Sequence, residues 1–196
     1  MMRRCFDVAV AAVALALTSP VLLAAIVAIR LESRGPAIYR QRRVGLHGEE
    51  FDLLKLRTMV DGAESIGAGL AVNVGDARIT RVGRLLRRTS LDELPNLVNV
   101  LRGEMSIVGP RPTVPWQVEQ YTGRERRRLS VRPGITGWAQ VNGRASLPWT
   151  ERIELDLWYI DHRSWRLDLE ILRRSARMVL RGEGLYKGTT GGWTPR

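Results

Sequence analysis

The sequence has few of the residues that build disulfide frameworks and zinc sites. Cys5 is the single cysteine, and His47 and His162 are the two histidines among 196 residues. One thiol excludes an intrachain disulfide and favours a reducing compartment. So few thiol and imidazole groups argue against a zinc site. No internal repeat is visible, and the length suffices for one domain with a hydrophobic core.

Acidic residues are also scarce. The chain has 20 Asp and Glu against 31 Lys and Arg, which gives a formal net charge of +11. This surplus predicts an anionic partner, which is a nucleic acid, a membrane surface or a phosphorylated substrate. The sequence carries no helix-turn-helix signature, zinc ligands or aromatic RNA-binding motif. We therefore expect lipid or phosphate as the partner, and no nucleic acid.

Charge is absent from residues 8–29, which are almost wholly apolar. As a straight helix this run would reach roughly 33 Å, just enough to cross a bilayer core. A cleaved signal peptide fits poorly, because the run continues through Pro20 without a small-residue cleavage site. A single spanning helix is the default interpretation. The alternative is a re-entrant helix that enters one leaflet, bends at Ser19 and Pro20, and leaves on the same side.

Two features favour the bend. Pro20 deletes a backbone hydrogen bond in the middle of the run, and Thr18 and Ser19 can bond to the freed carbonyls. Positive charge flanks both ends, as Arg3, Arg4, Arg30 and Arg34. The positive-inside rule would hold both ends in the cytoplasm. The residues alone leave the spanning and re-entrant interpretations open, and either one places the chain at a membrane.

The part after the apolar run begins with a predicted β-hairpin. Residues 37–44 and 50–59 read as two strands joined by a turn at residues 45–48. The period of two places Lys55 and Arg57 on one face of the second strand. Two cations that point together would suit phosphate binding. The alternative is an edge strand that charge protects from aggregation.

Five helices are predicted after the hairpin, over residues 81–88, 92–102, 116–129, 151–160 and 165–180. The first is basic and amphipathic, which is typical of helices on anionic lipid. The second has a buried face of Leu94, Leu97, Val98 and Leu101. The third ends in a basic run, Arg124 and residues 126–128, expected to be solvated or lipid-facing. The last carries an apolar stripe of Leu169, Leu172, Ala176 and Val179. A glycine-punctuated loop with short extended pieces is expected over residues 131–144.

Two adjacent carboxylates, Asp92 and Glu93, precede the second of these helices in an arginine-rich stretch. The surrounding guanidinium groups should favour ionisation of both acids. With Asp92 as the N-cap, Pro95 would fall at the third helical position, and the unpaired amides would attract phosphate. The alternative is a structural capping box between Ser90 and Glu93, which fits the S-x-x-E pattern.

Two arginines can reach the same place. Arg87 stands five residues before Asp92. Arg111 lies between Pro110 and Pro112 in a stiff loop, which would present its guanidinium at low entropic cost. An exposed structural arginine is the alternative interpretation of Arg111.

These motifs together resemble a known family. A helix broken at Ser-Pro is followed by KLRTM at residues 55–59, TSLDELP at 89–95, GPRP at 109–112 and PGITGW at 133–138. In this order they resemble the bacterial sugar transferases, the monotopic polyprenyl-phosphate phosphoglycosyl transferases, over nearly the whole chain. The resemblance implies the re-entrant form of the helix, with its break at Ser19 and Pro20. The chain looks like the small form of the family, without extra N-terminal membrane helices or an added domain.

The expected fold is α+β and mainly helical. It combines the re-entrant helix with a small β-hairpin and amphipathic helices at the membrane interface. We expect a membrane part at residues 1–34, a cytosolic phosphoglycosyl transferase domain at residues 35–185 and a flexible tail at residues 186–196.

The resemblance also implies a reaction. A sugar-1-phosphate would move from a nucleoside diphosphate sugar, usually a UDP-sugar, to polyprenyl (undecaprenyl) phosphate, with release of UMP. This is the first membrane step of glycoconjugate or exopolysaccharide assembly. Asp92 would be the nucleophile that forms an aspartyl-phosphosugar, and Glu93 would serve a magnesium ion. Two displacements through a covalent intermediate would relieve the repulsion between two anionic substrates, and Mg²⁺ needs few protein ligands.

The remaining expectations concern binding. The candidates for holding phosphate oxygens are Lys55, Arg57, Arg87 and Arg111. The candidates for contacts to nucleotide or sugar are Gln140, Asn142 and Arg144. The implied partners are a UDP-sugar, polyprenyl phosphate, anionic phospholipid and the downstream glycosyltransferases, and a homodimer is compatible with them. The implied location is the cytoplasmic face of the bacterial inner membrane.

Two other functions stay open at this point. A membrane-anchored basic protein without activity would explain the net charge and the apolar run, but not the adjacent acids. A magnesium-dependent diphosphatase would act on the same anionic substrates and release sugar phosphate without a lipid acceptor.

Overall fold

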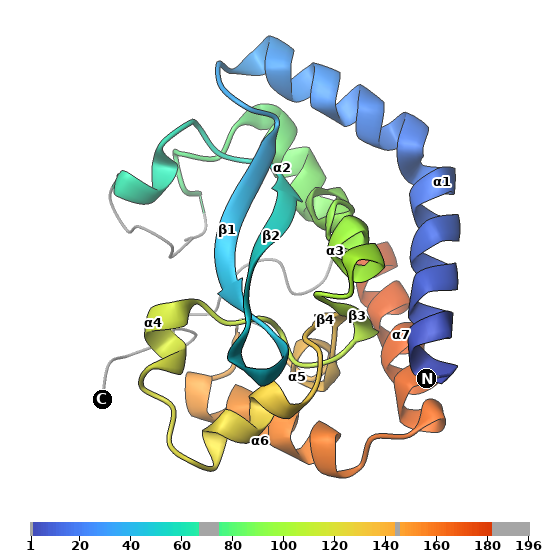
Figure 1. The fold of residues 1–196 in the computed structure, drawn as a ribbon. Coiled ribbons are helices and arrows are strands. Elements are labelled where there is room, and N and C mark those ends of the chain that lie inside the picture. The colour runs from blue at the N-terminus through green and yellow to red at the C-terminus, as the bar shows by residue number, and fades with distance from the viewer. Residues whose placement is uncertain (1, 67–74, 144–145, 182–196) are drawn as a thin grey trace.

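The structure, a computed structural model, describes residues 2–66, 75–143 and 146–181 (Figure 1). The fold is α+β and mainly helical, as predicted. The helices are α1 (Met2–Glu32), α2 (Arg81–Arg88), α3 (Asn96–Arg102), α4 (Pro115–Val118), α5 (Trp138–Val141), α6 (Trp149–Asp161) and α7 (Trp165–Arg181). The strands are β1 (Ile38–Val44), β2 (Glu50–Leu56), β3 (Ser106–Val108) and β4 (Gly134–Thr136). Short 3₁₀ turns are η1 (Leu46–Gly48), η2 (Ala63–Ser65), η3 (Leu91–Glu93) and η4 (Glu125–Ser130).

The predicted hairpin is confirmed. β1 and β2 are antiparallel, with Ile38 opposite Leu56 and Val44 opposite Glu50, and η1 forms the turn. β2 ends at Leu56, three residues earlier than expected. Met59 forms only an isolated bridge with Ile79, so the chain leaves the hairpin and turns toward α2.

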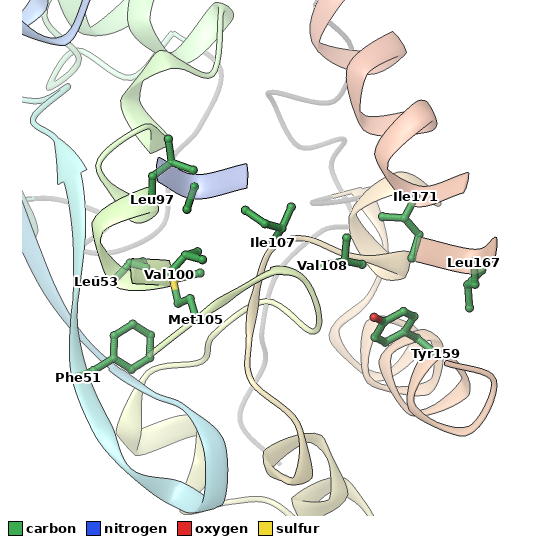
Figure 2. Close-up of a cluster of buried hydrophobic side chains, with 11 residues drawn as sticks. Phe51, Leu53, Leu97, Val100, Met105, Ile107, Val108, Tyr159, Leu167 and Ile171 are labelled. Carbon is green, nitrogen blue, oxygen red and sulfur yellow. The ribbon is translucent and has the colours of Figure 1, made fainter. Parts of the chain in front are cut away.

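One hydrophobic cluster joins the hairpin to the helices (Figure 2). Its buried members come from α1, β2, α3, the β3 region, α6 and α7, and they are Ala11, Phe51, Leu53, Leu97, Val100, Met105, Ile107, Val108, Tyr159, Leu167 and Ile171. β3 pairs in parallel with β4 at its centre. Gly109 and Gly134 permit this contact, because a Cβ on Gly134 would lie 2.1 Å from the Gly109 nitrogen. The cluster therefore fixes the hairpin and the loop after β3 relative to α3.

α1 is a 31-residue helix with Pro20 inside it, and Figure 1 shows that it bends part-way along the side of the domain. The Ser19 hydroxyl donates to the Ala16 carbonyl at 2.8 Å, and Thr18 donates to Ala14 at 2.7 Å. Ala16 is the residue whose carbonyl would otherwise accept from the missing N–H of Pro20. The helix is long and apolar enough to cross a membrane, and most of its apolar side chains are exposed.

Both ends of α1 are attached to the same domain. Near the N-terminus the buried Asp7 carboxylate accepts from Ser106 Oγ at 2.7 Å and from the Ile107 amide at 3.0 Å. At the C-terminus Glu32 accepts from the amides of Arg81 and Val82 at 2.7 and 2.9 Å, in the first turn of α2. The middle of α1 is therefore the part that stands away from the polar anchors.

The prediction of a single helix over residues 116–129 was wrong. Residues 116–129 do not form one helix, because α4 ends at Val118 and the chain continues through Gly123 to η4. The Glu125 carboxylate accepts from the Thr122 amide at 2.7 Å, which stabilises this break. Arg128, expected in a solvated or lipid-facing run, is buried. Val118 and Tyr121 pack in a second hydrophobic cluster with residues of α6, and together with the buried Arg128 they draw this segment inward. This is a long-range effect that local helical periodicity does not report.

α6 and α7 lie where helices were expected, but α7 buries a different face. Its buried residues are Leu167, Asp168 and Ile171. Asp168 is drawn inward because it accepts hydrogen bonds from Tyr159 and Arg3. Three members of the expected stripe are exposed, Leu169 (68%), Ala176 and Val179 (44%), and Leu172 is half-buried against the hydrophobic cluster.

Candidate active site

Asp92 and Glu93 lie in the turn η3, and α3 begins at Asn96. Pro95 is the N-cap of α3, so the expectation that Asp92 caps a helix with Pro95 at its third position was wrong. The capping box was wrong too, because Ser90 makes no side-chain cap hydrogen bond and adopts φ 56°. The two acids are therefore free of any helix-capping role.

Glu93 is bound by two cations. Its Oε1 accepts from Lys55 Nζ at 3.0 Å and from Arg111 Nη2 at 2.9 Å. The side chains of Lys55 and Glu93 are 16% and 14% exposed, and that of Arg111 is 43% exposed. Burial alone would raise the pKa of Glu93, but Arg111 and Lys55 outweigh it and hold this pKa well below its usual range. Glu93 is therefore a fixed negative charge.

Asp92 has the opposite character. Burial, followed by the charge of Glu93, raises the pKa of Asp92 to about 6, against the opposing effect of Lys55, Arg87 and Arg111. The surrounding cations favour ionisation of both acids, as expected, but they prevail only at Glu93, because burial and Glu93 outweigh them at Asp92. At pH 7 a carboxyl with this pKa is still about 90% ionised. The two adjacent acids therefore differ. Glu93 stays ionised, whereas the pKa of Asp92 lies close to neutral pH.

Arg87 reaches Asp92 from α2. Its Nε donates to Thr58 Oγ1 at 2.8 Å, and its charge acts on the Asp92 carboxylate. α2 packs closely on the segment after β2, because a Cβ on Gly83 would lie 2.0 Å from the Thr58 carbonyl oxygen. Thr80 caps the helix by accepting from the Gly83 amide. Glycine at position 83 thus brings Arg87 to the acids.

The chain has close relatives among known proteins. The sequence profile of the bacterial sugar transferases matches residues 1–182. The chain is 46% identical over 186 residues to an uncharacterized sugar transferase, EpsL, of Bacillus subtilis, which covers 95% of this chain and 91% of that protein.

This chain belongs to the bacterial sugar transferase family.

Two further relatives have more specific names. A UDP-glucose:undecaprenyl-phosphate glucose-1-phosphate transferase of Caulobacter vibrioides is 45% identical over 94% of this chain and 72% of its own length. A UDP-N-acetylgalactosamine-undecaprenyl-phosphate N-acetylgalactosaminephosphotransferase of Aeromonas hydrophila is 42% identical over 93% of this chain and 44% of its own length. The motifs that carried the family resemblance in the sequence are therefore those of a true member.

The acids of this sugar transferase suit a metal only in part. Within residues 2–66, 75–143 and 146–181, no group of three or more His, Cys, Asp or Glu side chains is arranged to hold a metal ion. Mg²⁺ is commonly bound by one or two carboxylates together with substrate phosphates. Glu93 is ionised and Asp92 adjoins it, so the donor set fits Mg²⁺ that takes its remaining ligands from a substrate.

Arg57 does not contact Asp92 or Glu93 in the described structure. Its guanidinium donates to the carbonyls of Ser33, Arg34 and Gly35, just beyond the end of α1. Lys55 and Arg57, expected to act together, contact different groups, because Lys55 donates to Glu93 and Arg57 donates to carbonyls after α1. A phosphate-binding role for Arg57 stays a prediction, and its observed contacts are structural.

Gln140 and Asn142, two of the other expected contact residues, bond to groups other than the acids. Gln140 is buried in α5, and its amide nitrogen donates to the Ile135 carbonyl at 3.3 Å. Asn142 donates to Trp138 and accepts from Arg174. Arg144 lies outside the described residues. Contacts of these three residues to nucleotide or sugar stay predictions.

The sequence interpretation missed Arg43. Its Nη1 donates to the Pro112 carbonyl at 3.0 Å, next to Arg111. Burial, followed by the charge of Arg111, lowers the pKa of Arg43 to about 10, and Glu93 opposes this shift. The register of the hairpin could have indicated this residue. Tyr39 is opposite Lys55, and Arg43 lies on the same face of β1 as Tyr39 by the period of two.

Proposed function

We propose that this sugar transferase moves a sugar-1-phosphate from a UDP-sugar to undecaprenyl phosphate. The observation that carries the proposal is the differentiated pair, Asp92 poised near neutrality beside an ionised Glu93 that Lys55 and Arg111 hold in place. The names of the Caulobacter and Aeromonas relatives support the donor and acceptor classes.

The transfer takes place in two displacements. An Asp92 carboxylate oxygen attacks the phosphorus that carries the sugar, the bond from this phosphorus to the bridging oxygen breaks, and UMP leaves with the electron pair. A phosphate oxygen of undecaprenyl phosphate then attacks the same phosphorus. The bond to Asp92 breaks, and the carboxylate is restored. The acceptor is largely dianionic at pH 7 by analogy with phosphoserine, so it needs no general base.

The cations bind and orient the phosphates. Arg111 is the most exposed of the cations around the acid pair. Arg87 acts on Asp92 from α2. Guanidinium groups form strong charge-assisted hydrogen bonds to phosphate oxygens. Lys55 is mostly buried against Glu93, so its contribution is to fix that carboxylate.

Glu93 would hold Mg²⁺ together with phosphate oxygens of the donor. When bound, the ion would neutralise negative charge on the diphosphate. The fixed ionisation of Glu93 serves this role, because a metal ligand must be deprotonated.

The proposed location is the cytoplasmic face of the bacterial plasma membrane, with α1 as a re-entrant helix. Asp7 and Glu32 attach the two ends of α1 to one domain, and arginines flank both ends. A helix that crossed the bilayer would separate these ends by the membrane thickness. Anionic phospholipid, a second copy of the chain and downstream glycosyltransferases stay predicted partners.

The first experiment measures UMP release by detergent-purified protein from UDP-glucose, UDP-galactose and UDP-N-acetylgalactosamine. Each donor is tested with and without undecaprenyl phosphate and Mg²⁺. We expect release that requires both, and its loss in Asp92→Asn. Asp52→Asn is the matched control, because this carboxylate is 42% exposed and pairs with the exposed Arg42.

Other results identify the rival functions. Repeated turnover without the acceptor, with far more than one UMP released per enzyme, indicates a diphosphatase. No release from any donor, together with unchanged vesicle binding by Asp92→Asn, indicates a basic membrane anchor without activity.

A second experiment tests the covalent step. Radiolabelled UMP should exchange into the UDP-sugar without any acceptor, because the first displacement is reversible and complete in itself. Direct transfer between the two substrates predicts no exchange, and it would overturn the role of Asp92 as nucleophile while leaving the overall reaction intact.

A further inference from the structure

The backbone that carries Arg111 is held at every carbonyl. Four consecutive carbonyls, from Pro110 to Thr113, each accept one hydrogen bond, and the donors come from three segments of the chain, β1, η4 and β4. The four bonds are Gly134 N to Pro110 O at 2.8 Å, Arg128 Nη2 to Arg111 O at 3.2 Å, Arg43 Nη1 to Pro112 O at 3.0 Å and Val44 N to Thr113 O at 2.8 Å.

Arg128 is the side chain that holds the carbonyl of Arg111 itself, and it is fully engaged. Its side chain is 5% exposed. All five of its N–H donors have acceptors, which are Asp156 Oδ2 (from Nε and from Nη2), Thr113 Oγ1, Tyr121 Oη and the Arg111 carbonyl. A guanidinium has five N–H groups in a fixed fork. Arg128 therefore has no donor left for a substrate phosphate.

Asp156 anchors this guanidinium from α6. Its side chain is 2% exposed, and its Oδ2 accepts from Arg128 Nε at 3.0 Å and Nη2 at 2.6 Å. A buried ion pair of this kind contributes little net stability, because apolar side chains of the same volume often serve as well. Its distinctive contribution is geometric, since the fork fixes where the Arg111 carbonyl lies.

We propose that Arg128 and Asp156 are positioning residues that aim the Arg111 guanidinium at the reacting phosphate. The inference rests on the phosphate-binding role of Arg111 in the proposed function. Prolines at positions 110 and 112 already fix φ on both sides of Arg111. The remaining backbone freedom is the orientation of the Arg111 peptide carbonyl, and the Arg128 hydrogen bond removes it. The side chain then points at Glu93 before substrate arrives.

The test is a double-mutant cycle between positions 128 and 111, measured with the UDP-sugar of the panel that gives the highest kcat/KM. Arg128→Lys keeps the charge but loses the fork. We expect it to lower kcat/KM about 10- to 100-fold, because a misplacement of about 1 Å has an effect of this size. The loss should appear chiefly as a higher KM for the donor. A merely structural defect would lower kcat with the folded fraction and leave KM unchanged.

The decisive comparison is the same substitution in an Arg111→Ala background, where Arg128→Lys should change kcat/KM less than about twofold. The control is Arg127→Lys, because Arg127 pairs with Asp161 at the surface of the same two elements, η4 and α6. If Arg128→Lys does not fold, Tyr121→Phe removes one acceptor and keeps the ring. We expect a loss of about three- to tenfold that again disappears in the Arg111→Ala background.

Additive losses in the two backgrounds would overturn the positioning role while leaving the proposed function intact. An Arg111→Ala enzyme with parental kcat/KM would overturn the role of Arg111 in the proposed function, and the positioning role with it.

Discussion

Lys55 and Arg111 donate to the same oxygen of Glu93, at 3.0 and 2.9 Å, although they lie 56 positions apart in the chain (111 − 55). This shared acceptor joins the hairpin to the proline-flanked loop. It also explains why the pKa of Glu93 is held well below its usual range, whereas at Asp92 burial and the charge of Glu93 outweigh the same cations and raise the pKa.

Glu93→Gln should destabilise the protein. The neutral amide removes the carboxylate that both Lys55 and Arg111 bond to in a mostly buried site, a change that typically costs about 3 kcal/mol. For a chain of this size we expect the Tm in detergent to fall by about 6 to 12 °C. Glu50→Gln is the control, because its pair with Arg42 is exposed, and its Tm should stay within about 1 °C. Equal shifts in both variants would contradict the shared-acceptor account.

The rate should depend on the ionisation of Asp92. Burial and Glu93 raise its pKa to about 6, so the attacking carboxylate predominates above pH 6 and is protonated below it. The kcat/KM for the UDP-sugar should therefore rise about tenfold per pH unit below pH 6 and level off above it. Initial rates between pH 4.5 and 8 measure this limb. A limb centred near pH 4 would mean that Asp92 titrates as an ordinary surface carboxyl.

Arg57→Lys should act on stability rather than on substrate binding. The buried guanidinium donates to three carbonyls after α1, and a lysine cannot reach all of them. We expect a Tm lower by about 4 to 8 °C. At a temperature where the variant is folded, its KM for the UDP-sugar should equal that of the parent. A raised KM would return Arg57 to the phosphate-binding set.

The topology of α1 can be read from the single cysteine. Cys5 is exposed near the N-terminus of α1. With a re-entrant helix, a membrane-impermeant maleimide should label Cys5 in inverted membrane vesicles and not in intact spheroplasts. Labelling in spheroplasts alone would establish a spanning helix.

Pro20→Ala is the companion variant for the same assay. It restores the backbone donor that the Ala16 carbonyl lacks and removes the cause of the bend, so part of the population should become labelled from outside. Ser19→Ala removes only the hydroxyl bond to Ala16 and keeps Pro20, so its labelling should match the parent. An unchanged pattern in Pro20→Ala would show that the anchors at Asp7 and Glu32 alone fix the topology.

Much of the local structure followed from sequence patterns. The apolar run broken at Pro20, the hairpin around Gly45, the helix from Arg81 and the two C-terminal helices all lie close to their expected positions. Each depends on contacts within a few residues, such as a proline without an N–H, alternation along a strand or an apolar repeat along a helix. The proline-flanked loop of Arg111 belongs to the same class.

Contacts between distant segments decided the rest. The sequence by itself determined which residues carry charge and where the chain turns. Only the tertiary structure separated Arg57 from Lys55, buried Arg128 against Asp156 and raised the pKa of Asp92 above that of Glu93. The physical reason is that burial and charge pairing depend on which segments pack together, and local periodicity does not contain that information.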